Sequence, residues 1–204
     1  MRRTAIAALT LCLSLPVYGQ ETGPMTLSDG TTVRPDDADR LNNFSVHFSG
    51  ALRQAFNSEN SDDVAMLVQS LRGPAMPPNE AMDALQGDWK CRTIKAGESS
   101  ALIVYGNFDC RVEGNSFEKT SGSQRTRGTV HEDAGRLIYL GTGFVQGSEV
   151  PDYAALAPDP LNAPVIGQVW SDIALVEVVS RDRARMIFPD PALESQMNVI
   201  YLTR

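Results

Sequence analysis

The residues 118–129 form a run of twelve that contains only polar side chains and glycine. Phe117 and Val130 at its two ends have the character of strand core residues. If the run is extended, alternate side chains point to opposite faces, and neither face suits an apolar core. Two interpretations stay open: an exposed hairpin around Gly122, or the lining of a polar recess that binds a ligand.

The chemistry that this run offers is the recognition of an anion. Arg125 carries a planar fork of donors that fits a carboxylate or a phosphate, and Gly122 allows close approach of the backbone. Buried donors must be satisfied, so Glu194 is an internal alternative to an anionic ligand for pairing with Arg125. The candidate ligand-binding residues are Lys119, Ser121, Ser123, Gln124 and Arg125, with Glu194 and Ser195 as partners from the final strand region.

The same run offers a second chemistry, nucleophilic catalysis. Ser121 or Ser123 beside Lys119 or Arg125 would make a serine-dependent hydrolase or transferase of unknown type. The residues 116–119 also match the S-x-x-K pattern of penicillin-recognising enzymes. In those enzymes the serine opens a helix, whereas Ser116 follows a predicted hairpin turn, so we reject that match. No catalytic residue is assigned, and a protein without enzymatic activity is favoured.

A metal site or cofactor is not expected. The two histidines, His47 and His131, are far apart, and no pattern of His, Cys, Asp or Glu has the spacing of metal ligands. We therefore predict neither a metal nor another cofactor.

The first residues have the three parts of a bacterial secretory signal. Arg2 and Arg3 precede an apolar run over residues 5–17, and residues 17–19 suit a signal peptidase, which predicts cleavage before Gln20. A membrane anchor is the alternative, but a run of about 13 residues is shorter than the roughly 20 that a membrane-spanning helix needs. We expect a periplasmic or secreted protein with no stable membrane insertion after cleavage.

The charge of the mature chain excludes one class of partner. Cleavage would remove two of the 18 basic residues and none of the 25 acidic ones, so the net charge becomes 16 − 25 = −9. A chain of this charge repels nucleic acid over most of its surface. The expected partner is a small polar or anionic ligand or an envelope protein.

Cysteine usage agrees with export. Cys12 leaves with the signal segment, and Cys91 and Cys110 then remain as one pair in an oxidising compartment. We predict a disulfide between them; two separate buried thiols are the alternative.

The chain divides into a signal peptide (1–19), a flexible leader (20–35), a helical portion (36–86) and a β portion (87–204), the last two forming a single domain. Apolar residues at helical spacing predict helices over 37–56, 61–71 and 79–85. From Gly87 onward, short runs of aromatic and β-branched residues alternate with turn signals. The predicted strands cover 89–94, 101–105, 108–112, 116–121, 126–131, 136–140, 165–170, 174–179, 184–188 and 197–202.

Many short strands joined by hairpins predict an α+β, mostly β fold. The expected architecture is an antiparallel β-barrel or strongly curved sheet, calycin/lipocalin-like, with the N-terminal helices packed against it. The stretch 148–164 is expected to be one long loop.

Four motifs in order carry a resemblance to a known family: G-x-W-x-C-R at 87–92, F-x-C-R at 108–111, G-S-Q-R at 122–125 and E-S at 194–195. This pattern resembles the exported bacterial proteins of the family called domain of unknown function 4893. The similarity extends over roughly residues 36–204. It supports export and the disulfide, and it implies no activity.

A separate likeness concerns the fold. Gly87-x-Trp89 at the first predicted strand is similar to the G-x-W of lipocalin-type barrels and of small periplasmic metalloprotease inhibitors. In such barrels the tryptophan closes one end and an arginine covers it, a part that Arg204 or Arg185 would take. The alternative is a tryptophan buried in an ordinary β core.

Three functions remain in competition. The first is a non-enzymatic periplasmic binding domain, which needs a recess and no activated nucleophile. The second is the serine-dependent enzyme, which needs a serine hydrogen-bonded to a base. The third is an inhibitor of an exported protease, for which the residues 20–35 are the projecting segment. The first is favoured.

Overall fold

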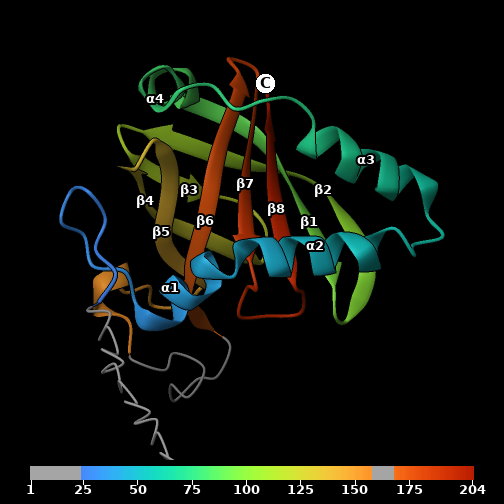
Figure 1. The fold of residues 1–204 in the computed structure, drawn as a ribbon, viewed down its shortest axis with the longest axis horizontal. Helices are drawn as coiled ribbons and strands as arrows, with labels where there is room; N and C mark the ends of the chain where they lie inside the picture. The colour runs from blue at the N-terminus through green and yellow to red at the C-terminus, as the bar shows by residue number, and fades with distance from the viewer. Residues whose placement is uncertain (1–23, 158–167) are drawn as a thin grey trace, which may run out of the picture.

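A computed structural model describes residues 24–157 and 168–204, so the predicted signal peptide lies outside the described residues. Eight antiparallel strands form a closed barrel in which each strand pairs with the next and the last pairs with the first (Figure 1). This confirms the predicted fold class. The strands are β1 (Gly87–Gly97), β2 (Ser100–Glu113), β3 (Ser116–Lys119), β4 (Gln124–Asp133), β5 (Arg136–Val145), β6 (Val169–Ser180), β7 (Arg183–Pro189) and β8 (Met197–Thr203).

Two pairs of predicted strands are single strands in the structure. The segments 101–105 and 108–112 are joined in β2, because Asn107 pairs with Arg92 and a bulge between Arg92 and Ile94 absorbs the irregularity. The segment 174–179 belongs to β6, which begins at Val169. The residues 165–167 of the predicted strand before it lie outside the described part.

Between residue 24 and the barrel, the structure contains four helices: α1 (Pro35–Asn42), α2 (Phe44–Ala55), α3 (Ser61–Leu71) and α4 (Pro78–Leu85). A single helix was predicted over 37–56, and the structure divides it at Asn43. The side-chain amide of Asn43 donates a hydrogen bond to the Asp39 carbonyl. Such a bond competes with the backbone hydrogen bonds of the helix, which allows the helix to break at Asn43. The third helix begins as predicted, with Asn60 as its N-cap.

The helices α2 and α3 cover the outside of the barrel over β1, β2 and β8 (Figure 1). Ala51, Ala55 and Leu67 pack there against Ile94 and Val199. The end of α3 is held by Arg185, which reaches out of β7 and donates to the carbonyls of Ser70, Arg72 and Gly73. These bonds satisfy acceptors that a helix end otherwise leaves unpaired.

The described part of the expected leader, residues 24–34, is ordered rather than flexible. Thr26 and Thr32 form a β-bridge, and Leu27 and Val33 are buried against Ile138 and other apolar residues on the outer face of β5 and β6. The polar composition of this segment obscured two apolar side chains that are spaced to face the barrel.

One end of the barrel is closed. The helix α4 lies across it (Figure 1), and Trp89 donates from its indole nitrogen to the Leu85 carbonyl at 2.7 Å. The Arg204 guanidinium lies 3.9 Å from the Trp89 ring centroid, so Arg204 and not Arg185 covers the tryptophan. The G-x-W motif therefore has the role expected from its likeness to lipocalin-type barrels.

The predicted disulfide is confirmed. Cys91 of β1 and Cys110 of β2 are bonded, with their Cα atoms 5.8 Å apart, and both are buried inside the barrel next to the Trp89 end. No helix in residues 24–157 or 168–204 combines the length and the apolar character needed to cross a membrane.

Candidate ligand-binding cavity

A cavity of about 230 Å³ lies inside the barrel at the end opposite α4. Its walls come from residues near the β1–β2, β3–β4 and β7–β8 turns, whereas α4 packs at the other ends of these strands. Side chains alternate across each strand, so Trp89 and Cys91 of the apolar interior are followed on the same face of β1 by Thr93 and Lys95. The lining residues are Thr93, Lys95, Tyr105, Phe108, Lys119, Ser123, Gln124, Arg125, Thr126, Trp170, Asp172, Phe188, Glu194, Asn198 and Ile200.

Two glycines of β5 make room for aromatic rings in this interior. A Cβ atom on Gly141 would collide with the Tyr139 hydroxyl, and one on Gly143 would collide with the Trp170 indole. Gly143 is the register partner of Trp170 across the β5–β6 ladder. The missing side chains let the indole lie against β5 and form part of the cavity wall.

Lys119 is a buried ammonium group in the cavity wall. Only 4% of the residue is exposed, and its Nζ donates to the carbonyls of Ser121 (2.8 Å) and Gln124 (2.7 Å). Nζ also lies 3.9 Å from the Phe108 ring centroid. Burial, together with the positive charges of Arg125 and Lys95, lowers the pKa of Lys119 to about 8. Among the described residues no carboxylate lies within ion-pair distance of it.

Arg125 does not pair with Glu194. Its Nε donates to the Gly122 carbonyl at 2.9 Å, and no acidic residue in the described ranges forms an ion pair with it. Glu194 pairs instead with Lys95, with Nζ and Oε2 2.5 Å apart, and this hydrogen bond lowers the pKa of Glu194. The pairing of β1 with β8 places the β7–β8 turn next to Lys95. In that turn the backbone N–H of Gln196 donates to the Ala96 carbonyl of β1.

Asp172 is a buried carboxyl group on β6, 6% exposed. The Trp170 indole donates to its Oδ1 at 3.0 Å, and Thr126 provides a second hydrogen bond. Thr126 Oγ1 is in turn 2.7 Å from the Tyr139 hydroxyl. Burial raises the pKa of Asp172 to about 6.

Five of the seven predicted site residues line the cavity, and two do not. Ser121 Oγ accepts from the Asp109 backbone amide at 2.7 Å, and Ser195 Oγ donates to Asn198 Oδ1, also at 2.7 Å. Ser195 thereby orients a lining residue. The residues that line the cavity are Lys119, Ser123, Gln124, Arg125 and Glu194.

Sequence reasoning missed several polar or amphipathic lining residues, among them Lys95, Trp170 and Asp172. A signal for each was present in the strand period. Lys95 is six residues after Trp89, and Asp172 is two residues before the buried Ala174, so each falls on the inward face.

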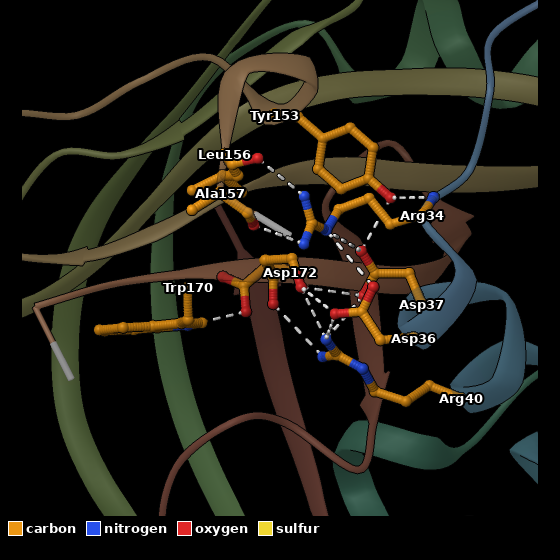
Figure 2. Close-up of polar contacts among 10 residues, drawn as sticks. Arg34, Asp36, Asp37, Arg40, Tyr153, Leu156, Ala157, Trp170 and Asp172 are labelled. Carbon is orange, nitrogen blue, oxygen red and sulfur yellow. Dashed lines mark hydrogen bonds and ion pairs between the residues drawn. The ribbon is translucent and has the colours of Figure 1, made fainter. Parts of the chain in front are cut away.

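A polar cluster on the outer wall of the barrel contacts the part of β6 that carries Trp170 and Asp172 (Figure 2). Between Trp170 and Asp172, Ser171 points outward and accepts at its Oγ from Arg40 (2.7 Å). Arg40 also pairs with Asp37 (2.7 Å), whose pKa is raised because burial outweighs the attraction of Arg40. We call this cluster the α1 clasp; it consists of Arg34, Asp36, Asp37, Arg40, Tyr153 and Ser171.

The two histidines lie outside the cavity. His131 Nδ1 is 2.7 Å from an Asp29 carboxylate oxygen, and His47 Nδ1 is 3.8 Å from one of Asp190. In the part of the chain that the structure describes, no three His, Cys, Asp or Glu residues are grouped so that they could hold a metal ion.

Comparison with known proteins supplies a family and no activity. Neither a curated protein nor a solved structure matches the chain. The family model described as Domain of unknown function (DUF4893) matches residues 30–202, which include α1 to α4 and nearly the whole barrel. The chain therefore belongs to the DUF4893 family.

Proposed function

We propose that this protein is an exported, non-enzymatic binding protein that holds a small anionic ligand in the barrel cavity. The observation that carries the proposal is the pair of cations, Lys119 and Arg125, in the cavity wall without an acidic partner in the described chain. A buried ammonium is unfavourable unless an anion or several acceptors compensate it. The chain has 25 acidic and 18 basic residues, so acidic partners are abundant. That Lys119 and Arg125 have no acidic partner among the described residues therefore points to an anion from outside the chain.

The size and walls of the cavity favour a small metabolite. At about 230 Å³ the cavity is below the range of roughly 300–1,000 Å³ that is common for drug-sized ligands. Phe108, Phe188 and Ile200 give it apolar walls between the polar groups. This combination suits a short apolar body that carries a carboxylate or phosphate.

Export is supported by two features. The arginine pair and apolar run at the N-terminus have the pattern of a secretory signal, and the Cys91–Cys110 disulfide belongs to an oxidising compartment.

Binding is favoured over serine catalysis by the geometry of the serines. Lys119 bonds to the backbone carbonyl of Ser121, while the Ser121 hydroxyl is used by the Asp109 amide. Within the described residues no serine in this region is hydrogen-bonded to a base, which a serine nucleophile requires. The inhibitor hypothesis has less support, since residues 24–34 pack on the barrel instead of projecting from it.

The test is calorimetric titration of the mature protein with acetate, butyrate and inorganic phosphate. We expect at least one of these anions to bind. Lys119→Met and Arg125→Gln should each weaken that binding by about tenfold or more, as expected for loss of a charge-assisted hydrogen bond.

The matched control is Lys90→Met. Lys90 is on the same barrel but its side chain is 64% exposed, where it pairs with Asp109. This variant should bind as the wild type does. Absence of binding by all three anions, or equal loss in the control, would contradict the proposed function.

A further inference from the structure

The charges in the cavity are separated by strands. Lys119 and Arg125 lie at the β3–β4 turn, whereas Asp172 is on β6. Between them runs β5, whose inward positions at this level are Gly141 and Gly143 and carry no side chain. The cations and the carboxyl group therefore face the same cavity from different walls.

These opposite charges do not compensate one another. No ion pair joins Asp172 to a cation within the described ranges, and Arg40, whose positive charge lowers the pKa of Asp172, lies outside the barrel wall in the α1 clasp (Figure 2). The positive charges of Arg125 and Lys95 lower the pKa of Lys119. The contrast is Lys95, which has its own acid in Glu194.

The surroundings of Asp172 suit a cationic group. Its carboxyl oxygens receive hydrogen bonds from Trp170 and Thr126, and the two oxygens of a carboxylate have about four lone-pair positions, so acceptor capacity remains. The Trp170 indole also lines the cavity, and an indole ring attracts ammonium ions.

We infer that the ligand is a small zwitterion, with its anionic group at Lys119 and Arg125, its ammonium group at Asp172, and a short apolar body between them. This inference rests on the proposed function and deepens it. An α-amino acid holds its two charges on one carbon, whereas the two walls of the cavity call for charges at opposite ends of the body. The ligand class is thus that of ω-amino carboxylates.

The experiment compares matched compounds on the wild-type protein: γ-aminobutyrate and δ-aminovalerate, the monocarboxylates butyrate and valerate, and the dicarboxylates glutarate and adipate. At least one ω-amino acid should bind about tenfold or more tightly than the monocarboxylate of equal length, the gain expected of an ammonium–carboxylate hydrogen bond. The dicarboxylate of equal length should bind more weakly than the monocarboxylate, because its second anion meets Asp172.

The variant Asp172→Asn then assigns the preference to one residue. It should abolish the preference, so that the ω-amino acid and the monocarboxylate of equal length bind this variant within about twofold of each other, with a melting curve to verify the fold. If wild-type protein binds the monocarboxylate as tightly as the ω-amino acid, the zwitterion inference is wrong while anion binding stands. If none of the carboxylates binds, the zwitterion inference fails, and the titration with inorganic phosphate decides separately whether anion binding stands.

Discussion

At the scale of single residues, the barrel interior is unusual in holding charges that destabilise the fold. Lys95 and Glu194 compensate each other. Burial lowers the pKa of Lys119 and raises the pKa of Asp172, and both shifts favour the neutral form of the group. Such groups are typical of sites, where a ligand completes what the fold leaves uncompensated.

Because of Asp172, the free energy of unfolding should depend on pH in a defined direction. Its pKa is about 6 in the folded protein and 3.8 for the unperturbed group, so between these values the folded state holds more protons than the unfolded state. Stability should therefore fall as the pH rises from about 4 to about 7, by about 3 kcal/mol from this residue.

The measurement is the free energy of unfolding of wild type and Asp172→Asn over this pH range. The Asn variant lacks the titrating group, so its stability relative to wild type should rise by about 3 kcal/mol between the two ends of the range. Asp37, whose pKa is also raised, is present in both proteins and cancels in the comparison. Parallel curves would contradict the assignment.

The sequence predicted those residues of the candidate site that lie outside the alternating apolar pattern of the strands. Lys119, Ser123, Gln124 and Arg125 were found because they lie in a run without apolar side chains. Lys95 and Asp172 were missed because they stand within apolar strand segments, and only the three-dimensional closure of the barrel shows that the strand period turns them inward. The sequence left open whether Glu194 or an anionic ligand pairs with Arg125, because the pairing of Glu194 with Lys95 depends on strands that are distant in the sequence.

At the scale of elements, β5 is the strand that shapes the cavity. Its inward positions change from Leu137 and Tyr139 to Gly141 and Gly143, and the space so gained is filled by the Tyr139 and Trp170 rings. The orientation of the indole thus depends on the absence of a methyl group on the neighbouring strand.

Gly143→Ala should push the Trp170 indole out of its position. We expect a loss of about 1–3 kcal/mol in the free energy of unfolding, as is common for an overpacked interior, together with weaker ligand binding. The control is Gly106→Ala, a strand glycine with no atom within 4 Å of the added Cβ, which should leave both properties nearly unchanged. Equal effects of the two substitutions on urea unfolding would contradict this role of Gly143.

The elements themselves followed from local patterns with few exceptions. The apolar spacing and the Ser61-Asp62-Asp63 start located α3, and hairpin signals located most strands. The break at Asn43 escaped detection because the apolar spacing continues across it, and this spacing carries no information on the hydrogen bonds of the Asn43 side chain to the carbonyl and carboxylate of Asp39.

At the scale of the whole molecule, the barrel has one sealed and one polar end. The helix α4, Trp89 and Arg204 seal the first, and the disulfide lies next to them between β1 and β2. The cross-link therefore stabilises the apolar half of the barrel and leaves the cavity half free of covalent constraint.

Replacing both cysteines, as Cys91→Ala with Cys110→Ala, should lower the free energy of unfolding by about 3 kcal/mol, the chain-entropy value for a closed loop with a sequence separation of 19. Ligand affinity should stay within about twofold of wild type at a temperature where the variant is folded. Urea unfolding and titration of the same samples measure both. An unchanged unfolding midpoint, or a loss of binding as large as that of Lys119→Met, would contradict this division of the barrel.

The pairing of β1 with β8 limits the order in which the strand pairs of the barrel can form. The β1–β2 hairpin and its cysteines are neighbours in sequence, so they can meet as soon as they are synthesised or translocated. The other edge of β1 has no native partner until β8 arrives, after every intervening strand has been produced. During that interval the exposed edge is a template for pairing with a second chain. Closing the barrel therefore has to wait for β8, and the same pairing brings the β7–β8 turn, with Glu194, to Lys95.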